Sequence, residues 1–344
     1  MDTLPIEELK KIPHLNHDAL PGQILCTTMF WVDGEWQFWL PVGNQLIRMQ
    51  ALPAEMAYFG QSAHRVDDIF LGLLNLIAQH ACLQGTVREF TGLLDDVKNI
   101  GTSIQKLDLL LANRQQVAHG MARMISTEVE YLAVQCRSIF DFLQGILRTL
   151  WQNTRLLPGM RSPRTTLPDT FSKMVVLKNE LATADGIAAR FELPKPIAEA
   201  YGRQVEFFAS LRTLRDNIVH HGSQPPPIFV SEQGEPLIRR TQRPFDSFVS
   251  WQPDEILTND LVPLRPAINA MIYRTLHACE DLAFSLTQTI GLPPPLCPGF
   301  NLYLKLYTAR NLSDLLAEAG TRQSEIALVE NSSAQPTRSD ASKL

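Results

Sequence analysis

The chain has few cysteines, and they form no recognisable pair. The 344 residues contain five, scattered and without a CxxC spacing: Cys26, Cys82, Cys136, Cys279 and Cys297. An odd, dispersed set disfavours a disulfide framework or a structural zinc site, so we expect a reducing, cytoplasmic location and no metal site. The chain also lacks an apolar run of 18 residues, and its first residues lack a basic start followed by an apolar segment. We therefore expect no membrane span and no secretory signal.

Positive charge is not in excess. There are 31 Lys and Arg residues against 36 Asp and Glu residues, which gives a formal net charge of -5. A protein that coats duplex nucleic acid through a broad basic surface is therefore not expected, although a small basic cleft is compatible with this balance. The sequence contains no Walker A, GxGxxG, HExxH or GxSxG motif. These absences argue against a P-loop ATPase, a Rossmann enzyme, a zincin and an α/β-hydrolase, and no cofactor is expected.

The amino-acid pattern predicts a mainly helical chain. Proline is absent from residues 61–153, where apolar residues recur at helical spacing. The cleanest helix covers 121–151, and further helices are expected at 170–184, 196–221, 264–290 and 313–319. Two short hairpins are also expected, one in 23–42 around Asp33-Gly34 and one in 228–241 around Gln233-Gly234. The three tryptophans of the first hairpin are expected to be packing residues, and a platform for stacking bases is the less favoured interpretation. They are Trp31, Trp36 and Trp39.

These patterns predict a division of the chain. Residues 1–60 form an irregular and hairpin segment, and residues 61–291 form a helical domain with a hairpin insertion at about 227–260. Residues 292–319 form a C-terminal extension. Residues 320–344 are poor in large apolar groups and are expected to be a disordered tail.

The most informative stretch is LRTLRDNIVHHGS, residues 211–223. It places Arg215 five positions and Asp216 four positions before His220; His221 follows, and Gly222 is a helix stop. This stretch resembles the Arg-x4-His signature of the HEPN superfamily, an all-α group that contains many RNases and toxins. The resemblance implies a mainly α fold, a HEPN-like helical bundle with small β-hairpin additions. The spacing fits His220, and His221 fits a register one residue longer.

These residue types suit RNA cleavage without a metal. A histidine titrates near neutral pH and transfers protons, and an arginine offers a permanently charged fork that matches phosphate oxygens. Asp216 stands four residues before His220, and Asn217 stands four before His221, so each is placed to support its histidine. On an ideal helix, however, Arg215 and His220 lie roughly 140° apart. Either the last turn unwinds, or two copies of the motif meet across a twofold interface, as the HEPN resemblance implies.

Other interpretations of the same residues stay open. Histidines in a last helical turn also complement the helix dipole, and Arg212 and Asp216 suit an ordinary ion pair. Arg114 and His119 give a second Arg-x4-His match, in RQQVAHG. His14 and His17 suggest a metal only weakly, since no carboxylate accompanies them.

Two further groups of residues are candidates for supporting roles. Arg137 and Asp141, four residues apart on the long helix, are candidates to support the Arg–His pair from another helix, although a plain ion pair is the simpler interpretation. Basic residues also gather in two loops, the first with Arg155, Arg161 and Arg164. The second contains the RNA-binding candidates, which are Arg239, Arg240 and Arg243. With the nearby Phe245, Phe248 and Trp251, these arginines suit an RNA-gripping flap.

The function expected from these features is a metal-independent endoribonuclease of HEPN type that cleaves RNA in a cleft at a homodimer interface. Arg215 would stabilise the scissile phosphate and His220 would transfer protons, with Asp216 or His221 assisting. The resemblance further implies a toxin or antiphage defence effector, with an antitoxin or regulatory partner. The alternative is a non-catalytic helical scaffold for dimerisation or partner binding.

Overall fold

The computed structural model describes residues 4–49, 54–117, 120–160, 165–177, 180–220 and 227–333. Within the last turns of two helices, at residues 217–220 and 325–333, it describes the backbone but not the side chains. Within these residues, no helix combines the length and the apolar character needed to cross a membrane.

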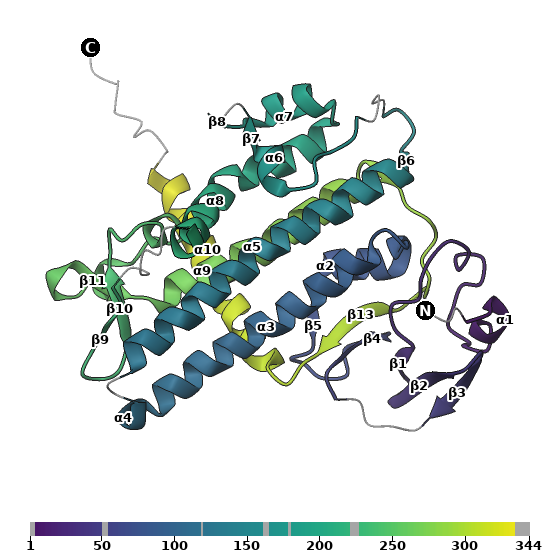
Figure 1. Cartoon of the computed structure of the whole chain (residues 1–344), viewed down its shortest axis with the longest axis horizontal. Coiled ribbons are helices and arrows are strands. Elements are labelled where there is room, and N and C mark those ends of the chain that lie inside the picture. The colour runs from purple at the N-terminus through teal and green to yellow at the C-terminus, as the bar shows by residue number, and fades with distance from the viewer. Residues whose placement is uncertain are drawn as a thin grey trace, which may run out of the picture.

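A six-stranded mixed sheet lies beside the helices (Figure 1). Its strand order is β3-β2-β1-β4-β13-β5; β1 and β4 pair in parallel, and the other neighbours are antiparallel. The strands are β1 (Met29–Val32), β2 (Glu35–Val42), β3 (Gln45–Met49), β4 (Met56–Gly60), β5 (Ile69–Phe70) and β13 (Asn301–Lys305). The predicted first hairpin is confirmed: β1 and β2 join through Asp33 and Gly34, whose φ angles of 50° and 79° suit the twist of a tight hairpin.

The sheet corrects the predicted fold class. The protein is not a mainly α bundle with small hairpin additions; it is a mixed α/β structure. Strand β13 lies between β4 and β5, although about 230 residues of sequence separate it from them. The expected C-terminal extension therefore completes the sheet that the N-terminal segment begins. Local hydrophobic pattern cannot reveal a pairing between strands so distant in sequence.

Five long helices make up most of the rest of the described chain, and they lie together in Figure 1. They are α3 (Val87–Ala112), α5 (Met121–Asn153), α8 (Lys195–His220), α9 (Arg265–Thr287) and α10 (Ala309–Ser333). The predictions for α5, α8 and α9 are confirmed within a few residues. The apolar residues that recur at helical spacing along α5 are buried, and they are Ile125, Val129, Leu132, Cys136, Ile139, Phe140, Leu143, Ile146, Leu147 and Leu150. Residues 320–333, expected to belong to a disordered tail, are helical as part of α10, and residues 334–344 lie outside the described part.

One predicted helix is wrong. Residues 170–184 form only the short helix α6 (Phe171–Val175), followed by the strands β7 (Val176–Leu177) and β8 (Glu180–Leu181). The β-branched pair Val175-Val176 marks the change from helix to strand. Helix α7 (Ala184–Phe191) then begins with Thr183, whose hydroxyl accepts a hydrogen bond from the Gly186 N–H at 3.1 Å.

Short elements complete the described chain. The helices are α1 (Ile6–Leu9), α2 (Gly72–Leu76) and α4 (Arg114–Val117), with a π-helical turn at Ile77–Ala81. Strands β6 (Arg155–Leu156) and β12 (Ile290–Gly291) pair with each other. The second predicted hairpin is confirmed as β9 (Phe229–Val230) and β10 (Pro236–Arg239), and β11 (Leu261–Pro263) adds a third strand. Single 3-10 turns lie at Phe245–Ser247, Pro253–Glu255 and Thr258–Asp260.

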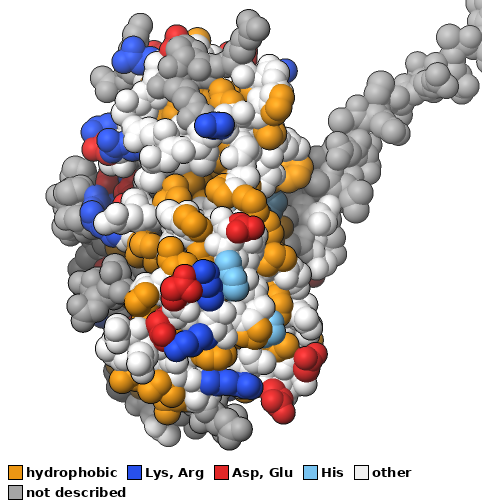
Figure 2. Space-filling view, turned by 90° about the vertical axis from the view of Figure 1, so that its right-hand side faces the viewer, with side chains coloured by type: hydrophobic (Ala, Val, Ile, Leu, Met, Phe, Trp, Pro, Cys, Tyr) orange, Lys and Arg blue, Asp and Glu red, His pale blue; other side chains and the backbone are white. Residues whose placement is uncertain are grey.

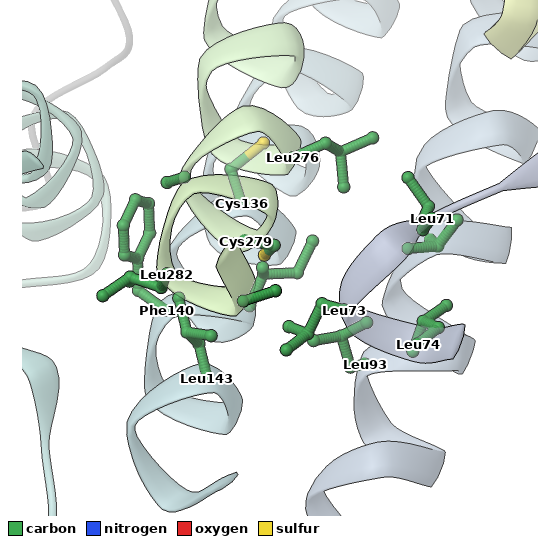
Figure 3. Close-up of a cluster of buried hydrophobic side chains, with 14 of the residues drawn as sticks. Leu71, Leu73, Leu74, Leu93, Cys136, Phe140, Leu143, Leu276, Cys279 and Leu282 are labelled. Carbon is green, nitrogen blue, oxygen red and sulfur yellow. The ribbon is translucent and has the colours of Figure 1, made fainter. Parts of the chain in front are cut away.

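One continuous core joins the sheet to the helices. Figure 3 shows its centre, where leucines of α2 meet side chains of α3, α5 and α9. The inner face of the sheet belongs to the same core, because Phe30, Phe59 and Leu304 alternate with outward-facing neighbours and are almost completely buried. The core thus holds α8 against α5, α6 and α9, and this packing fixes the position of the Arg-x4-His stretch.

Candidate functional site

Three charged side chains form a network near the end of α8. Asp216 accepts a hydrogen bond from the Arg215 guanidinium at 3.0 Å and another from Arg212 at 3.2 Å. Arg212 also donates to the Ser172 hydroxyl of α6 at 2.9 Å. The network therefore ties the end of α8 to the neighbouring short helix. The predicted ion pair between Arg212 and Asp216 is confirmed.

The hydrogen bond to Asp216 directs the Arg215 side chain toward the neighbouring face of α8. Helix α8 continues through His220, so the last turn does not unwind before that residue. Positions 215 and 220 therefore keep their separation of roughly 140°, with position 216 between them and about 40° from position 220. Because the Arg215 guanidinium reaches the Asp216 carboxylate, its charge lies nearer the His220 side of the helix than its backbone position indicates.

Asp216 stays ionised at neutral pH. Partial burial raises the pKa of its carboxyl group, but the hydrogen bonds from Arg215 and Arg212 outweigh that effect and hold the pKa below its usual value. An ionised carboxylate one turn before position 220 favours the protonated form of a histidine there. The structure describes the backbone of Asn217 and His220 but not their side chains, and His221 lies outside the described residues.

A groove runs along the same face of α8. Its volume is about 440 Å³, and it is lined by Ala209, Ser210 and Thr213 of α8 and by the loop residues Arg243, Pro244, Asp246 and Ser247. Position 220 lies within about 20° of Ala209 and Thr213 around the helix, about 10 Å farther along its axis from Thr213. The groove and the end of the Arg-x4-His stretch therefore share one face. Ser210 and Thr213 did not stand out in the sequence, although the seven-residue spacing of Thr213 from His220 was a usable signal.

The three RNA-binding candidates separate in the structure. Arg243 is exposed at the groove, and no described acidic side chain lies within ion-pair distance of it. Arg240 forms an ion pair with Asp260 at 2.8 Å, and Arg239 is exposed at the end of β10. The predicted aromatic flap is wrong, because Phe245 and Phe248 are core residues and the Trp251 indole donates to the Pro263 carbonyl at 3.0 Å. Of the three arginines, Arg243 is the one that lines this groove.

Arg137 and Asp141 do not join the α8 network. They form an ion pair at 2.7 Å on α5, and the Arg137 guanidinium lies 4.5 Å from the centre of the Phe208 ring of α8. Phe208 precedes Arg215 by seven residues, about 10 Å along the helix. The pair therefore contributes to the packing of α5 against α8, and it does not contact the Arg215–Asp216 pair.

The remaining sequence candidates lie in packing contacts or outside the described residues. Arg114 packs beside Gly234 of the β9–β10 hairpin, and His119 lies outside the described residues, as do Arg161 and Arg164. The His14 ring packs against the rings of Phe30 and Phe300. Among the described residues, no three His, Cys, Asp or Glu side chains are grouped so that they could hold a metal ion.

Comparison of the chain with protein-family models, with curated proteins and with solved structures finds no match.

Proposed function

We propose that the protein is a metal-independent endoribonuclease that cleaves RNA at the end of α8. The observation that carries the proposal is the Arg215–Asp216 pair, which places a guanidinium and an ionised carboxylate beside the turn that ends at His220. An arginine fork and a histidine are the groups that 2′-hydroxyl attack on a phosphodiester requires.

In the proposed reaction, the ribose 2′-oxygen attacks phosphorus and the bond to the 5′-oxygen breaks. One proton leaves the 2′-hydroxyl and one proton is delivered to the departing 5′-oxygen. His220 transfers a proton, and Arg215 stabilises the negative charge that develops on the phosphoryl oxygens. Asp216 orients Arg215 and favours the charged form of the histidine. The products are a 2′,3′-cyclic phosphate and a 5′-hydroxyl.

The groove beside Arg243 supports this proposal. An exposed arginine and the hydroxyl-bearing residues Ser210 and Thr213 suit a flanking phosphate of the same RNA strand. Asp246 also lines the groove and repels phosphate, so Arg243 sets where the strand passes. We further propose that two copies of α8 face each other in a homodimer, because a twofold axis brings a second Arg215 toward each His220.

A second candidate function has its own observation. The Arg212–Asp216 pair and its hydrogen bond to Ser172 also suit a scaffold in which α8 is tied down for dimerisation or partner binding. This candidate requires no cleavage of RNA by the wild type.

Incubation of the purified protein with a labelled tRNA pool in EDTA separates the two candidates. We expect cleavage by the wild type, with 2′,3′-cyclic phosphate ends, and its loss in Arg215→Ala and His220→Ala. Arg310→Ala and His277→Ala are matched controls, because both side chains are exposed on other helices. Products with 3′-hydroxyl ends, or equal cleavage by the Arg215 and control variants, would contradict the proposal.

A further inference from the structure

The outer face of the six-stranded sheet carries an unbroken row of rings. Trp31 of β1 lies 5.1 Å from Trp36 of β2, measured between ring centroids, and Trp36 lies 4.9 Å from Tyr58 of β4. Tyr58 stacks on Tyr303 of β13 at 5.7 Å, and Tyr303 lies 6.0 Å from Phe70 of β5. The row therefore crosses five of the six strands.

The row is only partly accessible to solvent, and Phe70 is its most exposed ring. Phe70 is 48% exposed at one end, whereas Trp31, Trp36 and Tyr303 are partly exposed and only Tyr58 is buried. The opposite face of the same strands is core, since Leu302 and Leu304 are almost completely buried on either side of Tyr303. Aromatic rings on the solvent side of a sheet are unusual, because a solvated face ordinarily alternates to polar residues. This face therefore lacks the polar residues that are usual on a solvated sheet face.

One loop packs against the row. The His64 ring lies 4.5 Å from Trp31 and 4.9 Å from Trp36. The His64 N–H donates to the Tyr58 hydroxyl at 2.7 Å, and that hydroxyl donates to Asp68 at 2.7 Å. The loop is thus fixed to the sheet, and the rings are held in place before any ligand arrives.

Charges of both signs lie beside the rings. The Lys305 ammonium lies 5.2 Å from the centre of the Trp36 ring, and among the described residues no acidic side chain forms an ion pair with it. Burial lowers the pKa of His64, and the cations Lys305 and Arg65 lower it further, against an opposing effect of Asp68. Asp68 is occupied by Tyr58 and by the Arg65 N–H, and Asp67 is paired with Arg65 at 2.9 Å. Asp67 and one carboxylate oxygen of Asp68 are therefore engaged, whereas Lys305 faces the Trp36 ring.

We infer that this aromatic row binds unpaired bases of single-stranded RNA, with Lys305 against the phosphodiester backbone. Stacking on aromatic rings with a cation alongside is how single-stranded nucleic acid is held without regard to sequence. Figure 2 shows the side of the molecule near α1 and β3, where hydrophobic groups are interspersed with charges of both signs. The inference rests on the proposed function, because it names the class of RNA that the α8 site would receive.

The test measures binding of a fluorescent 2′-O-methyl oligonucleotide of about 12 nucleotides, a length within the usual site sizes. The methyl group blocks the nucleophile, so binding is separated from cleavage. Phe70→Ala removes the most exposed ring, and we expect a Kd about tenfold higher. Lys305→Glu should raise Kd by a similar factor and reduce the salt dependence by about one phosphate contact. A duplex of the same length should bind more weakly than the single strand.

Matched controls are Phe284→Ala and Lys195→Glu, which change exposed side chains of α9 and α8 away from the sheet. Both should leave Kd unchanged, and circular dichroism should show all four variants folded. Arg215→Ala should abolish cleavage and keep this binding, so failure of the nuclease proposal is distinguishable from failure of this one. Equal Kd values for Phe70→Ala and Phe284→Ala would overturn the inference. Absence of oligonucleotide binding, with self-association lost in Phe70→Ala, would also overturn it and identify the face as a protein interface.

Discussion

Asp216→Asn tests the charge network at the end of α8. The substitution keeps the size of the side chain but removes the charge that Arg215 and Arg212 share. Each partly exposed ion pair contributes about 0.2–1 kcal/mol, and the two contributions are not independent because they use one carboxylate. We expect the free energy of unfolding to fall by about 1 kcal/mol at pH 7, which lowers Tm by about 2 °C in a chain of this size.

The stabilisation by Asp216 should depend on pH. The pKa of Asp216 is lower in the folded protein than in the unfolded chain. Its contribution is therefore present above the unfolded value of about 3.9 and is lost as the pH falls through the folded value. Thermal unfolding at pH 7 and at about pH 3.5 should show the difference between wild type and Asp216→Asn shrinking with acid. Asp314→Asn is the control, because its pair with Arg310 is long and exposed. An unchanged Tm at pH 7, or an equal loss at both pH values, would refute the reasoning.

Three further predictions concern the helical core. Burial raises the pKa of Asp96 to about 6, so the contribution of this side chain to stability is present at acid pH and is lost as the pH rises through 6. Asp96→Asn should therefore raise Tm at pH 8 but not at pH 4. A decrease in Tm at pH 8 would contradict this. Leu143→Ala should lower the free energy of unfolding by about 2–5 kcal/mol in urea denaturation, because the site is completely buried among α5 and its neighbours. Gly92→Ala should lower the free energy of unfolding by about 1–3 kcal/mol, since the new Cβ would lie 2.4 Å from the Phe142 ring. A gain in stability would show that this ring moves aside freely.

The parts of the fold that depend on local pattern were predictable. The stripe on α5 repeats over 33 residues, so its buried face follows from spacing alone. The Asp33-Gly34 turn places two residues at positive φ, which these residue types tolerate. Each signal comes from neighbouring turns of one helix or from one tight turn, and long-range packing does not override it.

The sheet was not predictable from such patterns. Strand β5 has only two residues, and its partner Tyr303 lies more than 200 positions away. The pairing is decided by the tertiary core, which places β13 between β4 and β5. The same reason explains the aromatic flap, where Phe248 packs edge to face against Phe207 of α8 and does not face solvent.

The candidate site was predictable in composition but not in geometry. The sequence identified Arg215, Asp216 and His220, and the helical separation of Arg215 from His220 argued against a site on one helix. The contact between the Arg215 guanidinium and Asp216 depends on a side-chain conformation, which spacing does not determine. Arg243 reaches the groove only because the β10 region folds back beside Thr213.

The most direct measurement is the rate of tRNA cleavage in EDTA by the wild type, His220→Ala and His277→Ala at equal concentration. The account predicts that His277→Ala cleaves at the wild-type rate and that His220→Ala is slower by about 100-fold or more, the usual effect of losing a proton-transfer group. Equal rates for all three proteins, or no cleavage by folded, dimeric wild type, would contradict the assignment of RNA cleavage to the end of α8.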